Sequence, residues 1–180
     1  MEVSRLSALA PKHTILARYG KRSARLGDPK NRRRRNTMNR FTFWQKWLFI
    51  VSLGITAFGL FMAFFNQTPL FDVFNRQIDP AFWGSAPLPK GVTSFQGWLY
   101  GVWGATIAGW GIFLTFIAHI PFKRHEKWAW NCLVVGLGVW FVLDTGISWQ
   151  YGVTFNVFFN IVVVLATGMP LIFTRKAFVG

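Results

Sequence analysis

Residues 128–149 read WAWNCLVVGLGVWFVLDTGISW, a run of 22 residues in which Asp144 is the one charged side chain. An α-helix rises about 1.5 Å per residue, so a run of this length crosses the roughly 30 Å hydrocarbon core of a bilayer. The run lacks the alternation of polar and apolar residues that a membrane β-strand requires. Because backbone groups inside a bilayer must bond to one another, the stretch predicts a membrane-spanning helix.

Three further apolar runs of similar length occur at about residues 47–65, 97–120 and 153–173. The whole chain of 180 residues is 52% hydrophobic and only 14% charged. A soluble domain carries about 25% charged residues, because its surface faces water. The composition therefore excludes an ordinary soluble domain. Together with the run at 128–149, it predicts an all-α integral membrane four-helix bundle over residues 38–180.

Basic residues are strongly biased to one side of these spans. Residues 1–40 hold 12 of the 20 Lys and Arg residues, whereas the long loop at residues 66–96 holds two. Six more lie beside the spans on the same side as the N-terminus: Lys46, Lys123, Arg124, Lys127, Arg175 and Lys176. Since cytoplasmic flanks are enriched in Lys and Arg, both termini are predicted to be cytoplasmic.

The N-terminal segment, residues 1–37, is Arg-rich and has no long apolar period, so we expect it to be disordered. It is alternatively a targeting segment, a nucleic-acid-binding run or a contact for anionic lipid. Nucleic acid is the least favoured partner, because no aromatic or fold signature accompanies the charge. Met38, just before the first span, offers a second start, so the segment is alternatively untranslated.

The predicted outer loop at residues 66–96 is rich in proline and aromatic residues. Four prolines argue against a long helix there and favour a short helical turn near 71–76. Its Phe and Trp residues suit the membrane interface. We expect a lid over the ends of the bundle, with a substrate-gating lid as the alternative.

The second span carries small residues four positions apart: Gly97, Gly101, Ala105 and Gly109. Gly104 and Ala108 widen this stripe. Small residues let membrane helices approach closely, so the stripe predicts close packing, either within one molecule or between two copies.

Asp144 is the one ionisable residue well inside a span, and such residues usually face the bundle and have partners. By depth along the helices, we expect a polar cluster beneath the outer face, made by Asp144, Ser148, Asn156, Asn160 and Tyr100, with Thr145 beside Asp144 on the same helix. The cluster has two interpretations: polar contacts that hold the spans together, or a site for a ligand or a proton.

Catalytic and cofactor signatures are not evident. There is no P-loop, dinucleotide-binding glycine motif or nucleophile elbow. The single Cys132 excludes a disulfide framework and a multi-cysteine zinc site, and His119 and His125 have no third ligand at metal spacing. We predict no catalytic residue, metal or cofactor.

Several short motifs lie between Gln96 and Arg175: Tyr100-Gly101-x-x-Gly104-Ala105, Trp110-Gly111, Glu126-Lys127-Trp128, Trp140-x-x-x-Asp144 and Leu143-Asp144-Thr145-Gly146. With them the stretch resembles small four-span bacterial membrane proteins, loosely of the DoxX-like type. The resemblance implies a fold and a place in the bacterial inner membrane. The function expected is that of a non-enzymatic accessory or structural subunit, with lipid, a second copy or another membrane protein as partner. The alternative is a transporter or binder of a small or lipidic molecule at the Asp144 cluster, and a membrane enzyme ranks third.

Overall fold

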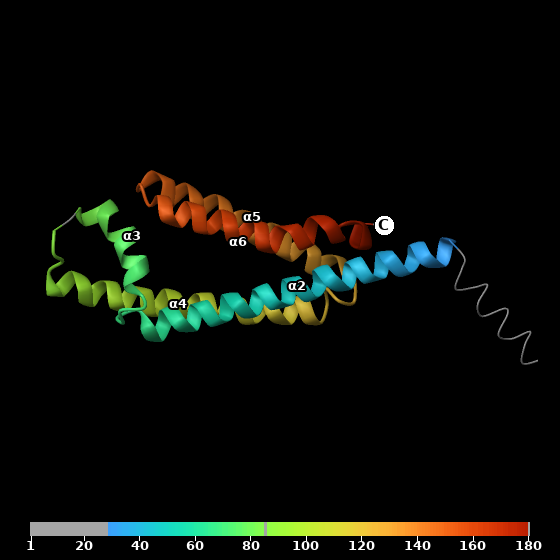
Figure 1. Cartoon of the computed structure of the whole chain (residues 1–180), viewed down its shortest axis with the longest axis horizontal. Helices are drawn as coiled ribbons and strands as arrows, with labels where there is room; N and C mark the ends of the chain where they lie inside the picture. Colours follow the sequence, from blue (N-terminus) through green and yellow to red (C-terminus); the bar gives the residue numbers. More distant parts are fainter. Residues whose placement is uncertain (1–28, 85, 180) are drawn as a thin grey trace, which may run out of the picture. The chain divides into compact units, whose positions relative to one another are not determined.

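The computed structural model describes residues 29–84 and 86–179, and within them every regular element is a helix (Figure 1). The helices are α2 (Pro29–Phe65), α3 (Asp72–Trp83), α4 (Lys90–His119), α5 (Lys127–Gln150), α6 (Thr154–Thr174) and α7 (Lys176–Val179). Four stretches are long and apolar enough to cross a membrane: Arg35–Phe65, Lys90–His119, Lys127–Gln150 and Thr154–Thr174. The predicted all-α architecture with four candidate spans is confirmed.

Helix α2 begins earlier than the sequence predicted. Residues 29–37 were expected to be disordered, but they continue the first span as one helix of 37 residues. Pro29 suits a first helical position, Arg and Lys are good helix formers, and adding turns to an existing helix is easy. Residues 1–28 lie outside the described part of the chain. Contacts divide the chain between Arg40 and Phe41, and the packing below concerns residues 41–180.

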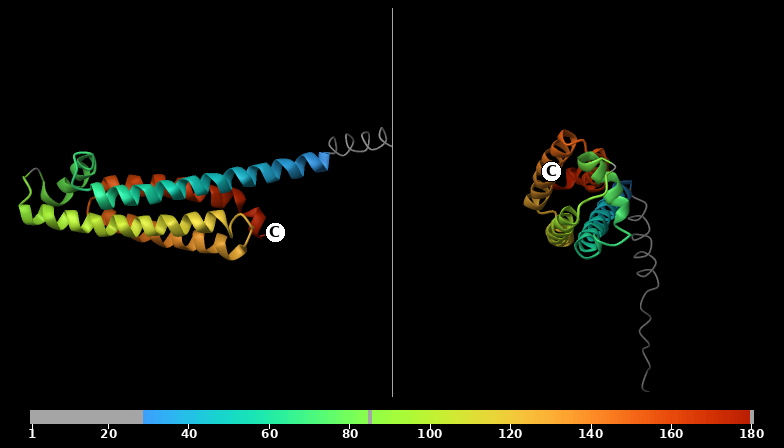
Figure 2. Two further views of the ribbon diagram at one scale, coloured as in Figure 1. Left: turned by 90° about the horizontal axis from the view of Figure 1, so that it is seen from below. Right: turned by 90° about the vertical axis from the view of Figure 1, so that its left-hand side faces the viewer.

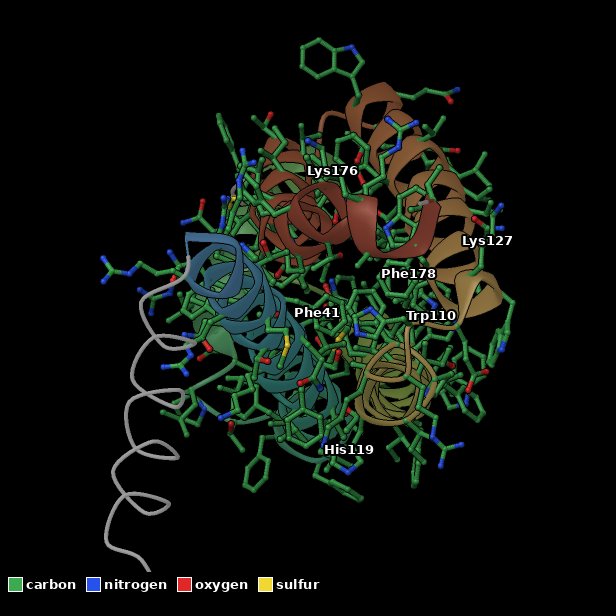
Figure 3. All side chains as sticks on the ribbon, turned by 90° about the vertical axis from the view of Figure 1, so that its right-hand side faces the viewer. Phe41, Trp110, His119, Lys127, Lys176 and Phe178 are labelled. Atoms are coloured by element: carbon green, nitrogen blue, oxygen red, sulfur yellow. The ribbon has the colours of Figure 1, made fainter. Side chains whose placement is uncertain are left out.

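Within this unit the spans form two hairpin-like pairs, α2 with α4 and α5 with α6 (Figures 1 and 2). One end of the unit, here called the α7 end, holds a core of Leu48, Ala118, Leu133 and Leu171, closed by aromatic side chains. Phe178 of α7 packs on Phe122, with ring centroids 4.8 Å apart. Figure 3 looks onto this end and labels Phe178.

Side chains at the α7 end also satisfy backbone carbonyls that the helices leave unbonded. Pro170, inside α6, has no N–H to donate to the carbonyl of Ala166 four residues earlier. The indole Nε1 of Trp47, on α2, donates to that oxygen at 3.0 Å. Buried Gln45 donates likewise to the carbonyl oxygen of Ala118, in the last turn of α4, at 2.9 Å. These bonds join neighbouring helices at groups that cannot be left unpaired in lipid.

The opposite end, here called the α3 end, has its own aromatic core. Phe71 is 2% exposed and packs with Met62 of α2 and Tyr100 of α4. Phe74 continues this core toward α6, where its ring meets that of Phe155 at 5.9 Å. Phe82, at the other end of α3, packs on Tyr151 beside the α5–α6 turn. Helix α3 therefore bridges the two helix pairs.

This end corrects the predicted loop of residues 66–96. In place of a short turn near 71–76, α3 is a helix of 12 residues with Pro80 inside it. A proline removes one backbone donor, and the packing of the aromatic face of α3 outweighs that loss. Helix α4 also starts at Lys90, directly after Pro89, and not near residue 97.

The interface between α2 and α4 is close enough to place backbone against backbone. A Cβ added at Gly104 would lie 2.6 Å from the carbonyl oxygen of Gly59 and 2.8 Å from the Cα of Ala63. A Cβ at Gly59 would meet Gly104 and Ala108 in the same way, and one at Gly111 would meet Thr56. Gly97 and Gly101 lie along the same face, beside Gln67 and Asn66.

Two of the four predicted stripe residues are not part of this interface. Ala105 is exposed, and a Cβ at Gly109 would have no atom within 4 Å. Residues four apart turn by about 400°, so a strict four-residue stripe drifts about 40° per step around a helix. The residues in contact, Gly104, Ala108 and Gly111, alternate steps of four and three and stay on one face.

Candidate functional site

The candidate site lies between α5 and α6, close to the turn that joins them. Gly152 has φ of 73°, a left-handed conformation that favours glycine, and its N–H bonds to the carbonyl oxygen of Trp149 at 3.1 Å. The N–H of Val153 bonds back to the carbonyl of Ser148 at 2.9 Å. So short a turn forces the two helices to run side by side in opposite directions, and it sets their register.

This register brings together the side chains that we call the Asp144 cluster: Asp144 and Ser148 of α5, and Asn156 and Asn160 of α6. The Nδ2 groups of Asn156 and Asn160 donate to Asp144 Oδ1 at 2.6 and 2.7 Å. Asn156 Nδ2 also donates to Ser148 Oγ at 2.7 Å. The Ser148 hydroxyl donates to the backbone carbonyl of Asp144 at 2.7 Å. Sequence reasoning thus placed four of the five predicted cluster residues together.

Thr145 also joins the cluster, as its position beside Asp144 on the same helix predicted. Its Oγ1 accepts a weaker bond from Asn160 Nδ2 at 3.3 Å. Asn160 therefore has acceptors from two consecutive residues of α5, and it is 1% exposed.

Tyr100 is not part of the Asp144 cluster, which corrects the fifth predicted residue. It packs in the core of the α3 end, with its ring 5.2 Å from that of Phe71. Tyr100 was placed by its depth along the span alone, and depth does not say which face of α4 a side chain occupies. That face is turned toward α2 and α3.

The two carboxylate oxygens of Asp144 differ in their surroundings. Oδ1 accepts both asparagine amides, whereas no donor to Oδ2 is present in the described part of the chain. All the bonds of the cluster run within α5 or between α5 and α6. Asp144 is half-buried, so the cluster acts as a polar link between two helices and leaves one carboxylate oxygen for a further donor.

Other residues with reactive or ligating side chains lie apart from this cluster. Cys132, near the start of α5, is exposed. His119 packs its ring on Phe49, and His125 stacks on Phe41 at 4.0 Å. Within residues 29–84 and 86–179, no three His, Cys, Asp or Glu side chains gather closely enough to hold a metal ion.

Comparison of the chain with known protein families, with curated proteins and with solved structures finds no significant match.

Proposed function

We propose that this protein is a non-enzymatic accessory or structural subunit of a bacterial inner membrane, similar to the DoxX-like four-span proteins, with both termini in the cytoplasm. The observation that carries the proposal is the Asp144 cluster, in which the polar groups of α5 and α6 bond to one another. A membrane site of this kind stabilises a helix pair, because the polar groups satisfy each other where no water is present.

The proposed orientation rests on charge. The α7 end carries Lys123, Arg124 and Lys127 around the α4–α5 turn, and Arg175 and Lys176 at the start of α7. No basic residue lies in the α5–α6 turn at the other end of the unit. The positive-inside rule favours placing the α7 end in the cytoplasm.

The proposed contact surface lies on α4, around Ala105 and Gly109. Both residues are left outside the α2–α4 interface, and a side chain added at Gly109 would meet nothing within 4 Å. Larger exposed residues flank this pair: Val102 lies one turn before Ala105, and Phe113 lies one turn after Gly109. A strip of small residues between larger ones lets a second helix approach, so we assign this surface to lateral contact with a second copy or another membrane protein.

In vivo cross-linking tests this surface. A photoreactive residue at Gly109 should yield a discrete adduct in intact cells, whereas the same residue at Val142, which is 67% exposed on α5, should yield mainly lipid adducts. In a variant with Cys132 replaced by Ala, Gly109→Cys should form a disulfide-linked dimer if the partner is a second copy. Equal yields of protein adduct from Gly109 and from Val142 would contradict the proposal.

A second candidate function is binding of a small molecule or a proton at Asp144, favoured by the open side of its carboxylate. The two functions separate in Asp144→Asn, which keeps an acceptor for Asn156 and Asn160 but removes the charge. If the cluster is purely structural, the Asp144→Asn variant should fully complement a deletion of the gene. A folded Asp144→Asn protein that fails to complement would establish the binding function instead.

A further inference from the structure

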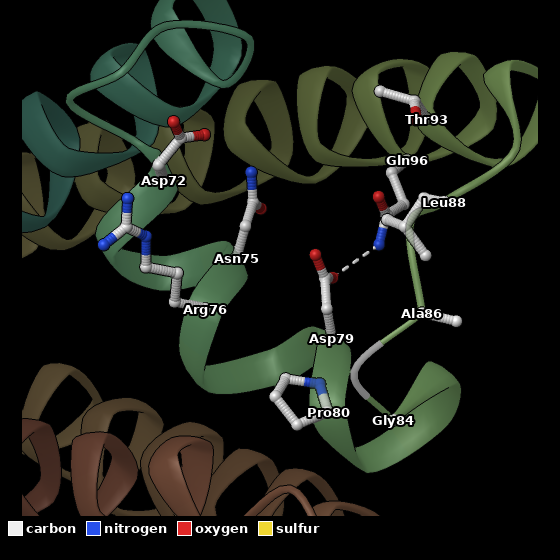
Figure 4. A pocket seen from close by; sticks show the side chains of 10 residues that line it. All are labelled: Asp72, Asn75, Arg76, Asp79, Pro80, Gly84, Ala86, Leu88, Thr93 and Gln96. Carbon is white, nitrogen blue, oxygen red and sulfur yellow. Dashed lines mark hydrogen bonds between the residues drawn. The ribbon is translucent and has the colours of Figure 1, made fainter.

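The two ends of the unit differ in how their charges are balanced. At the α3 end, Arg76 lines the same hollow as Asp72 and Asp79, and Asp79 there accepts a hydrogen bond from Gln96 at 2.7 Å (Figure 4). Together with Lys90, α3 and the start of α4 hold two basic and two acidic residues. The α7 end instead holds six exposed basic residues: Lys46, Lys123, Arg124, Lys127, Arg175 and Lys176.

A single carboxylate stands among these six cations, and its bond goes to another residue. Glu126 Oε2 accepts the indole Nε1 of Trp128 at 2.6 Å. Within residues 29–84 and 86–179, no ion pair neutralises any of the six basic side chains. Six cations and one carboxylate leave this end with a net charge of +5. An excess of one sign on a surface attracts a partner of the opposite sign, so this end calls for an anion.

The basic residues come from three segments that packing holds together: α2, the α4–α5 turn and the junction of α6 with α7. Phe178 packs on Phe122 with ring centroids 4.8 Å apart, which brings α7 against the α4–α5 turn. Gln45 of α2 donates to the carbonyl oxygen of Ala118, in the last turn of α4. The six cations therefore form one surface of fixed layout, here called the basic surface, at the end of the unit that Figure 3 views.

The basic surface lies at the level of the lipid headgroups. Helix α4 ends at His119 and α5 begins at Lys127, so the turn between them lies where two spans leave the hydrocarbon. Exposed aromatic residues border the basic surface on its apolar side: Trp47, Trp128 and Phe173. Since aromatic side chains gather at the membrane–water boundary, acyl chains reach these rings while the headgroup of the same lipid reaches the cations.

We propose that the basic surface binds an anionic phospholipid, whose headgroup phosphate is held jointly by α2, the α4–α5 turn and the α6–α7 junction. Phosphate oxygens accept charge-assisted hydrogen bonds from Lys and Arg, and basic pockets between membrane helices hold such headgroups. A lipid suits the site better than free phosphate, because a free anion would leave the aromatic border uncovered. The inference goes beyond the proposed subunit function and requires only that the α7 end lies at one surface of a membrane.

Lipid competition on the full-length protein tests the proposal. In nanodiscs of phosphatidylglycerol and phosphatidylcholine in equal parts, native mass spectrometry should show phosphatidylglycerol retained in preference to phosphatidylcholine. In micelles, added phosphatidylglycerol should raise the unfolding temperature more than phosphatidylcholine does, and salt should reduce this gain. Both leaflets of a nanodisc carry the same lipids, so an inverted orientation of the protein would leave the result unchanged. Equal retention of the two lipids, or equal stabilisation by inorganic phosphate alone, would overturn the proposal.

Substitutions of exposed basic residues, with a matched control, locate the site. A basic residue at a lipid surface is worth about five-fold in affinity, so Lys127→Gln/Lys176→Gln should weaken phosphatidylglycerol binding in micelles by about ten-fold or more. Lys46→Gln, on α2, should weaken it by about five-fold, and an unchanged affinity would contradict joint binding by the three segments. Arg76→Gln/Lys90→Gln removes two charges at the α3 end and should change binding less than about three-fold. Equal losses in the two double variants would reduce the effect to net charge and refute the assigned site.

Discussion

Replacing Gly104 with alanine tests the backbone contact between α2 and α4 directly. The new Cβ would lie 2.6 Å from Gly59 O and 2.8 Å from Ala63 Cα, whereas ordinary contacts begin at 3.4 Å. The backbone N of Ala63 lies nearer still, and no rotamer change can move any of these backbone atoms, so the helices must separate by more than about 0.8 Å. Overpacking of this kind costs about 1–3 kcal/mol. We expect Gly104→Ala to lower the free energy of unfolding despite alanine being the better helix former.

Gly138→Ala, in the middle of α5 and outside the proposed contact surface, is the matched control. It gains the same helix propensity, about 1 kcal/mol in soluble helices, but its Cβ meets no atom within 4 Å. The difference between the two variants therefore isolates the steric term, and we expect Gly104→Ala to be less stable by about 1–3 kcal/mol. Equilibrium unfolding in mixed micelles measures both. Equal stabilities would show that α2 and α4 do not approach as closely as the structure places them.

Three further outcomes are expected. Asp144→Leu should lower thermal stability in detergent, because two asparagine amides lose their acceptor and each lost hydrogen bond costs about 0.6 kcal/mol in membranes. Asp144→Asn should change thermal stability little, and the reverse order of the two variants would contradict the hydrogen-bonded cluster. Trp47→Phe should cost about 1 kcal/mol in the natural background but much less in a Pro170→Ala background, where residue 170 regains its N–H; the absence of coupling would show that the indole bond does not replace the missing helical one. In a Cys132-free background, a cysteine at Gln150 should react with an impermeant reagent outside the cell and one at Lys123 should not, and labelling at Lys123 would invert the proposed orientation.

The spans and the α5–α6 contact could be predicted from the sequence because both depend on local features. A long uncharged run fixes a span by its length. The turn at residues 150–153 is so short that Asp144 and Asn156, twelve positions apart, must lie at similar depth on adjacent helices. No comparable constraint acts on Tyr100, since a long connection separates its helix from the first span and the sequence does not show which face of α4 is inward. Its partner, Phe71, becomes evident only in the folded chain.

Only part of the α2–α4 interface could be predicted from the sequence, for a related reason. Both helices carry small residues at suitable spacing, Ser52, Thr56, Gly59 and Ala63 on α2 and Gly104, Ala108 and Gly111 on α4. The sequence of each helix taken alone allows many registers in which the small residues of α2 meet those of α4. Pairing one set with the other selects the alternating steps of four and three, and this selection leaves Ala105 and Gly109 outside.

The two helix pairs are held by different means, and this difference leads to a last prediction. Backbone proximity holds α2 against α4, and the Asp144 cluster holds α5 against α6, with no residue common to the two contacts. Distant sites without shared partners add within about 0.5 kcal/mol. The double variant Gly104→Ala/Asp144→Leu should therefore lose the sum of the two single losses, measured by the same unfolding in mixed micelles. A double loss smaller than the sum by more than about 1 kcal/mol would mean that opening one helix pair already releases the other. The bundle would then unfold as one cooperative unit, and not as two independently stabilised hairpins joined by Trp47 and α3.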